Sequence, residues 1–180
     1  MKIYRDYLRY KTSENKVYNF IKTLLYPSFI AIVFFRFADG IYHLNKKIFY
    51  FPAKLIMLIP RVLFGIDISI GAEIGEGFMI AHGCGVVIGS NVILGKNILI
   101  LQQVTIGGNH NKRRTYKLQE KIIHLDMPLI EDNCILSPGC KLLGPIIIGE
   151  NSLIGANVVL TRDVPKNSKV LGNTPVIMSI

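Results

Sequence analysis

The chain has few cysteines, few acidic residues and no long apolar run. Three cysteines, Cys84, Cys134 and Cys140, are an odd number without metal-type spacing, so structural disulfides are not expected. No cleavable signal peptide opens the chain, and a reducing, cytoplasmic location is therefore expected. With 12 acidic against 21 basic side chains the net charge is +9, which favours anionic partners such as phosphates or a membrane surface. The basic residues are scattered without a binding motif, which argues against nucleic acid as a partner.

The apolar residues near the N-terminus fall into segments too short to span a membrane. The longest uninterrupted run is about twelve residues, below the roughly twenty that a spanning helix requires. Residues 20–42 and 48–63 are predicted to form helices that pack on each other or on the rest of the chain, and Pro27 and Gly40 suit the start and end of the first. Residues 1–63 are thus an expected N-terminal helical region. Peripheral contact of its basic, aromatic surface with a membrane is the alternative.

From residue 64 onward the sequence is organised by a six-residue repeat. An aliphatic residue returns every sixth position and is often followed by a small one. In one register these aliphatic residues are Ile88, Leu94, Ile100, Ile106, Ile130, Leu136, Leu142, Ile148, Ile154 and Leu160. A period of six fits neither a helix nor a hairpin protein and is typical of a parallel β-helix with a shared aliphatic core. We therefore predict a mostly β fold with a β-helix domain over residues 64–180; another β-rich globule is the alternative.

Two places interrupt the repeat. The register slips by two residues between Ile80 and Ile88, and His82 lies within this disturbed segment. Residues 107–129 leave the repeat and return in register, which indicates an excursion from an intact coil. Long excursions of this kind are commonly functional.

Among the four histidines, one has a carboxylate at a suggestive spacing. Asp67 precedes His82 by fifteen residues, nearly one coil, so the two side chains could meet on adjacent coils. A carboxylate that orients one imidazole nitrogen leaves the other free to act as a base. A surface histidine with an unrelated aspartate explains the pair equally well. His110 and His124 lie in the excursion as candidate substrate contacts or solvated loop residues, and His43 is expected to be structural.

Several segments together carry a family resemblance. They are Tyr26-Pro27-Ser28-Phe29, Phe35-Arg36-Phe37-Ala38, Ile66-Asp67-Ile68, Ala72-Glu73-Ile74-Gly75, residues 100–108, residues 154–159 and Asp163-Val164-Pro165. This set resembles the serine acetyltransferase-like branch of the hexapeptide acyltransferases, which includes O-acetyltransferases of bacterial surface polysaccharides. The resemblance implies a left-handed β-helix, a homotrimer with active sites between subunits, and acetyl-CoA as donor, with no metal. It also implies that His82 is the catalytic base and Asp67 its orienting carboxylate.

The resemblance further implies where the donor binds. Backbone groups along a groove between two coils hold it in the family, and these positions match Gly108, Gly139 and Ala156. Small residues there let the pantetheine arm approach the backbone. Arg162 and Lys166 are candidates to meet the cofactor phosphates, with a solvated surface role as the equal alternative.

The acceptor is where the sequence departs from the family. Serine acetyltransferases carry an Asp just before the catalytic His and an Arg-His pair before a proline; here these places hold Ala81 and Asp126-Met127. An amino-acid substrate needs opposite charges facing its ammonium and carboxylate. We therefore expect the acceptor to be a hydroxyl of a glycan, from a capsule, lipopolysaccharide or exopolysaccharide. L-Serine, as in cysteine biosynthesis, is the alternative.

Two other functional classes stay open. A non-catalytic scaffold could use the same solenoid. A metal-dependent hydratase of the carbonic-anhydrase type would need about three convergent histidines. His82, His110 and His124 are the available set, without regular ligand spacing.

Overall fold

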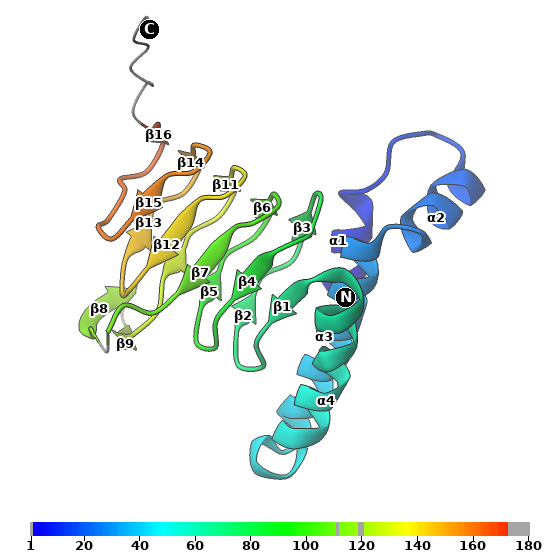
Figure 1. Ribbon diagram of the computed structural model, residues 1–180, viewed down its shortest axis with the longest axis horizontal. Coiled ribbons are helices and arrows are strands. Elements are labelled where there is room, and N and C mark those ends of the chain that lie inside the picture. Colours follow the sequence, from blue (N-terminus) through cyan, green and yellow to red (C-terminus); the bar gives the residue numbers. More distant parts are fainter. Residues whose placement is uncertain (1, 111, 119–120, 173–180) are drawn as a thin grey trace, which may run out of the picture.

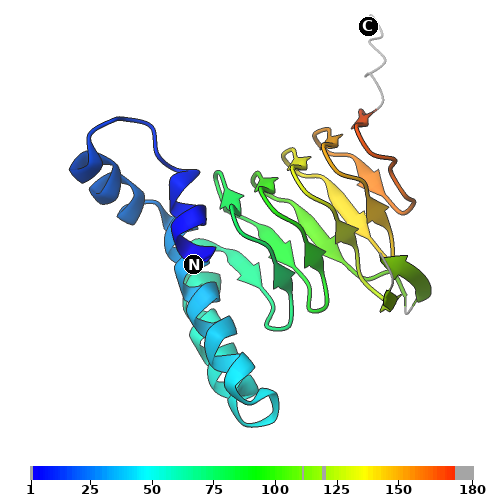
Figure 2. The same ribbon diagram turned by 180° about the vertical axis from the view of Figure 1, so that it is seen from behind.

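The computed structural model describes residues 2–110, 112–118 and 121–172, which form a β-helix with a group of helices at its N-terminal end (Figure 1). The helices are α1 (Lys2–Leu8), α2 (Lys16–Leu24), α3 (Pro27–Leu44) and α4 (Lys46–Phe64). Seen from behind, the helices again lie at one end of the β-helix and its last coil at the other (Figure 2). The predicted mostly β fold with an N-terminal helical region is confirmed.

Three parallel sheets form the faces of the β-helix. Face A contains β1 (Ile66–Ile68), β4 (Val86–Ile88), β7 (Thr105–Gly107), β12 (Lys141–Leu143) and β15 (Val159–Leu160). Face B contains β2 (Glu73–Ile74), β5 (Ile93–Leu94), β10 (Leu129–Ile130) and β13 (Ile147–Ile148). Face C contains β3 (Met79–Ile80), β6 (Leu99–Ile100), β11 (Ile135–Leu136), β14 (Leu153–Ile154) and β16 (Lys169–Val170). Loops join the faces in turn along three edges, which we call the AB, BC and CA edges.

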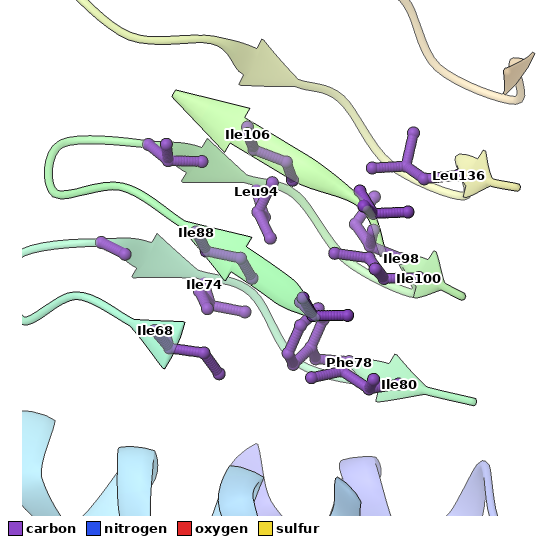
Figure 3. Packing of buried hydrophobic residues seen from close by; sticks show 14 of the residues in the cluster. Ile68, Ile74, Phe78, Ile80, Ile88, Leu94, Ile98, Ile100, Ile106 and Leu136 are labelled. Carbon is purple, nitrogen blue, oxygen red and sulfur yellow. The ribbon is translucent and has the colours of Figure 1, made fainter. Parts of the chain in front are cut away.

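The six-residue repeat supplies the core of this solenoid. All ten aliphatic positions of the repeat are buried, the most accessible being Leu160 at 6%. Figure 3 shows several of them stacked between successive coils. Cys134 and Cys140 belong to the same interior, and burial raises the pKa of both thiols, that of Cys140 to about 12. Each coil therefore repeats the same local packing on the coil before it.

The register slip is confirmed and lies on the CA edge. Ile68 pairs with Ile88, 20 residues later, whereas Ile88 pairs with Ile106, 18 residues later. The two additional residues belong to the loop between β3 and β4, which carries His82. The first CA loop is thus longer than the coil geometry requires.

The predicted excursion lies on the AB edge and contains a hairpin. Strands β8 (Arg114–Leu118) and β9 (Lys121–Leu125) pair antiparallel, with Thr115 opposite His124 (Figure 1). After the hairpin, β10 resumes face B beside β5, so the solenoid continues across the insertion.

Asparagines stabilise the BC edge. Each of four successive coils places one in the left-handed backbone region, with φ between 57° and 59°: Asn97, Asn133, Asn151 and Asn167. Their amides form a ladder, in which each Nδ2 donates to the next Oδ1 over 3.0–3.2 Å. Asparagine suits this role because its short polar side chain tolerates the left-handed region.

The helices differ in detail from the expectation. Helix α3 begins at Pro27 as predicted but continues through Gly40 to Leu44, so the predicted stop is wrong. A glycine inside a helix costs only about 1 kcal/mol, and packing of α3 against α4 offsets this. Helix α4 ends at Phe64 and is capped by Gly65, whose φ of 64° is typical of the residue after a helix C-terminus.

A buried ion pair attaches the helices to the β-helix. Arg36 of α3 donates from Nε to Asp6 Oδ2 over 2.8 Å, and both side chains are almost fully buried. The guanidinium also donates to the carbonyl oxygens of Ile74 and Gly75, and the Phe78 amide donates to Asp6. This network spans α1, α3 and the first coil.

Within the described residues no single helix has the length and hydropathy of a membrane span. Helices α2 and α3 meet that test only together, as a pair bent by 79°.

Candidate active site

His82 lies on the CA edge beside a cavity of about 590 Å³ between the first coils and the helices. Its backbone is left-handed, with φ of 59°, and its side chain is exposed. Gly83 follows; its amide donates to Ser28 Oγ over 3.1 Å, and a Cβ at this position would collide with Ile66. The loop is thereby held against α3 with the imidazole facing outward. A strained backbone at a cavity is common where a side chain must be positioned for function.

Asp67 lies on the adjacent coil but faces a different partner. Arg61 Nη2, in the last turn of α4, lies 2.8 Å from Asp67 Oδ2. This carboxylate lines a separate cavity of about 470 Å³ between α4 and face A. Among the described residues no hydrogen bond or ion pair joins Asp67 to His82. The predicted contact between His82 and Asp67 stays a prediction, because Asp67 would have to leave Arg61 to reach His82. No spacing in the sequence had indicated Arg61 as its partner.

Two predicted donor-binding residues share the CA edge with His82. Gly139 and Ala156 lie in the loops that lead into β12 and β15. The left-handed φ of 71° and the neighbouring side chain of Asn157 account for a glycine at position 139. Nearer His82, Gln102 lines the same cavity, and within the described chain its buried Oε1 has no hydrogen-bond partner. A ligand N–H would satisfy this acceptor.

Most other candidates lie on the AB edge. Gly108 and His110 follow β7, Arg162 follows β15, and all three are exposed. Within the hairpin, the His124 ring lies 3.3 Å from Thr115 Oγ1. His43, expected to be structural, lies on α3 and pairs with Asp39 over 3.3 Å.

Lys166 lies on the third edge, BC, away from the other candidates. It pairs with Glu150 over 3.2 Å and with Glu131 over 3.8 Å. The hydrogen bond that the Lys166 ammonium donates to Glu150 raises the pKa of this ammonium. Its charge is already matched by two carboxylates, so its predicted contact with a cofactor phosphate would need those pairs to open.

The AB edge holds a polar cavity that the sequence did not reveal. It measures about 510 Å³, and its charged and polar lining consists of Glu73, Asn91, Arg113, His124 and Asp126. Asn91 Nδ2 donates to Asp126 Oδ2 over 3.3 Å. Acidic and basic groups meet here from segments far apart in the chain, which is why no local motif pointed to them.

The three histidines weighed as metal ligands do not converge within one chain. His82 lies on the CA edge, whereas His110 and His124 lie on the AB edge. In the part of the chain that the structure describes, no three side chains of His, Cys, Asp or Glu come together as a metal site.

Comparison with known proteins places these features in a family. The model of the bacterial transferase hexapeptide (six repeats) matches residues 127–162. Serine acetyltransferase of Bacillus subtilis is 40% identical over 83% of this chain and 63% of its own length. Serine acetyltransferase of Helicobacter pylori is 37% identical over 83% of this chain and 80% of its own length. The chain thus spans less than two thirds of the Bacillus protein.

Solved structures of serine acetyltransferases are similar to this fold. Serine acetyltransferase isoform 3 of Entamoeba histolytica, in complex with cysteine, has a TM-score of 0.81 and 26% identity over 99% of this chain and 60% of its own. The Neisseria gonorrhoeae enzyme in complex with serine has a TM-score of 0.78 and 29% identity over 96% and 66%. A serine acetyltransferase in complex with CoA has a TM-score of 0.77 and 27% identity over 95% and 66%.

These relatives correct the expectation for the acceptor. The predicted glycan acceptor, and with it a role in polysaccharide biosynthesis, is wrong, because the matching proteins and structures are serine acetyltransferases. The glycan acceptor was inferred from charges missing at two positions of the family motif, whereas the charged side chains of the cavity on the AB edge come from segments that no local motif links. The hexapeptide repeat, the shape of the fold and the identity along most of the chain lead to one conclusion: the chain belongs to the serine acetyltransferase family.

Proposed function

We propose that this chain transfers the acetyl group of acetyl-CoA to the hydroxyl of L-serine. The observation that carries the proposal is its identity with bacterial serine acetyltransferases along most of its length. Solved relatives hold serine and CoA, which are the acceptor and the thiol product of such a reaction. The predicted enzyme class, an acetyl-CoA-dependent O-acyltransferase, rests on the same relatives.

In the proposed reaction His82 acts as general base. Its neutral imidazole accepts the proton of the serine hydroxyl, and the hydroxyl oxygen attacks the carbonyl carbon of the thioester. The carbon–sulfur bond breaks, and the imidazolium returns the proton to the leaving thiolate. The acetyl group moves directly to serine, so no acetylated side chain of this chain is needed.

Gln102 supports binding of the donor beside the base. Its buried Oε1 lacks a partner within the described chain and lines the same cavity as His82. The pantetheine arm carries amide N–H groups that could donate to this oxygen. Gly139 and Ala156 on the same edge leave the backbone accessible to that arm, as the resemblance implies.

The AB cavity supports an amino-acid acceptor. Arg113 offers a guanidinium for the carboxylate, and Glu73 and Asp126 offer carboxylates for the ammonium. His82 lies on a different edge, so an amino acid in this cavity would need the base of a second copy. We propose the homotrimer with sites between subunits, because that assembly would bring a CA edge and an AB edge together.

Replacement of His82 tests the reaction. His82→Ala is expected to lower thiol release from acetyl-CoA in the presence of L-serine by about 100- to 10,000-fold, the usual contribution of a general base. Far-UV circular dichroism should remain unchanged, since the side chain is exposed. His43→Ala, on α3, is the matched control and should retain activity. Full turnover of His82→Ala, or a wild-type chain inactive with L-serine, would contradict the proposal.

A further inference from the structure

Helix α4 presents a second apolar side to solvent. Its buried side, with Ala53, Met57 and Pro60, packs against the rest of the protein. Large apolar side chains recur every three or four residues on the opposite side and are 42% to 71% exposed: Ile48, Phe51, Leu55, Leu58, Ile59 and Val62. We call these six residues the outer row. A helix that is apolar all round is normally covered on both sides, by protein or by lipid.

Basic residues border the outer row. Lys47, Lys54 and Arg61 recur every seven residues, which places them in one line along the helix. Between Gly40 and Ile66 the sequence contains no Asp or Glu. Within the described chain neither Lys47 nor Lys54 forms an ion pair, and the Lys54 ammonium lies 5.9 Å from the centre of the Tyr50 ring. Arg61 is paired with Asp67, so the apolar side of the helix is bordered by two lysines, Lys47 and Lys54, that have no carboxylate partner within the described chain.

The basic line along α4 distinguishes between a second copy of the chain and a membrane as the partner that covers the outer row. A second copy that laid its own α4 antiparallel against the outer row would bring two basic lines together, which is repulsive. The acidic residues of the helical region lie elsewhere: Asp6 on α1, Glu14 between α1 and α2, and Asp39 on α3. An anionic bilayer surface complements both features, because acyl chains accept the apolar side chains and phosphate headgroups accept the ammonium groups.

We propose that α4 lies in the plane of a membrane surface containing anionic phospholipid, with the outer row at the acyl boundary. The chain then attaches peripherally through this helix. The attachment uses no residue of the His82 cavity or the AB cavity, but Lys54, Leu55 and Arg61 line the cavity that holds Asp67.

Sedimentation of the full chain with vesicles tests the attachment. The chain is expected to bind vesicles of equal parts phosphatidylcholine and phosphatidylglycerol and not phosphatidylcholine alone. Replacing Lys47 and Lys54 together by Gln should lower the partition coefficient about 25-fold, about fivefold for each lysine. Leu55→Glu should abolish binding, because it places a charge in the apolar row.

Val159→Glu is the matched control. Val159 is 58% exposed on β15, far from the helices, and this variant should bind vesicles as the wild type does. Equal binding of wild type, the double lysine variant and Leu55→Glu would overturn the proposal. Absence of vesicle binding by the wild type would overturn it as well. A lower solution mass for Leu55→Glu by light scattering would then show that another copy covers the outer row. Circular dichroism of each variant shows that the fold is retained.

Discussion

At the scale of single residues, Arg113 gives the sharpest test of the AB cavity. If its guanidinium binds the carboxylate of serine, Arg113→Gln should raise KM for L-serine about 10- to 100-fold, the value of one charge-assisted hydrogen bond. KM for acetyl-CoA should not change. Initial rates of thiol release at varied concentrations of each substrate measure both constants.

Lys112 is the natural control for this experiment. It precedes Arg113 and carries the same charge but does not line the cavity. Lys112→Gln should therefore leave KM for L-serine close to the wild-type value. An equal rise of KM for L-serine in both variants would mean that net charge, not a contact, affects binding. An unchanged KM for Arg113→Gln would exclude the contact between Arg113 and serine, while the proposed acetyl transfer would still stand.

At the scale of elements, the asparagine ladder of the BC edge determines how one coil continues into the next. Asn133 stands within it, donating to Asn151 and accepting from Asn97. Asn133→Ala should lower the free energy of unfolding by about 2–3 kcal/mol, because it loses these hydrogen bonds and forces alanine into the left-handed region. Urea denaturation followed by circular dichroism measures the change.

Asn133→Gly separates the two causes. Glycine adopts φ of 59° without strain, so only the hydrogen bonds are lost and the cost should be about 1–2 kcal/mol. At positions where φ is negative, alanine is the more stabilising of these two residues. A glycine variant less stable than the alanine variant would show that backbone strain is not what selects asparagine here.

At the scale of the whole molecule, Asp6 and Arg36 join the helices to the first coil. Removing one member leaves the other charge buried without its partner, so Arg36→Ala should cost about 3–5 kcal/mol of the free energy of unfolding. Lys11→Ala, which breaks an exposed pair with Glu14, should change little. Urea titration of both variants provides the comparison. A small effect of Arg36→Ala would mean that apolar contacts alone hold the two regions together.

Sequence reasoning succeeded where structure is local and repeated. The six-residue period predicted the β-helix and its buried positions, and the slip before Ile88 located the irregular loop of His82. It was less successful with the helix boundary at Gly40, because packing outweighs the local preference of a single glycine. It missed Arg61 beside Asp67 because helix packing, not spacing, brings them together.

By itself the sequence determined the solenoid, its aliphatic core and the loop that carries His82, because every coil repeats the same contacts with its neighbour and the pattern is legible in the chain. Only the tertiary structure decided which distant side chains meet. Arg113 and Asp126 share a cavity, and α4 turns a second apolar side outward, because the hairpin and the helices pack at places that no period specifies.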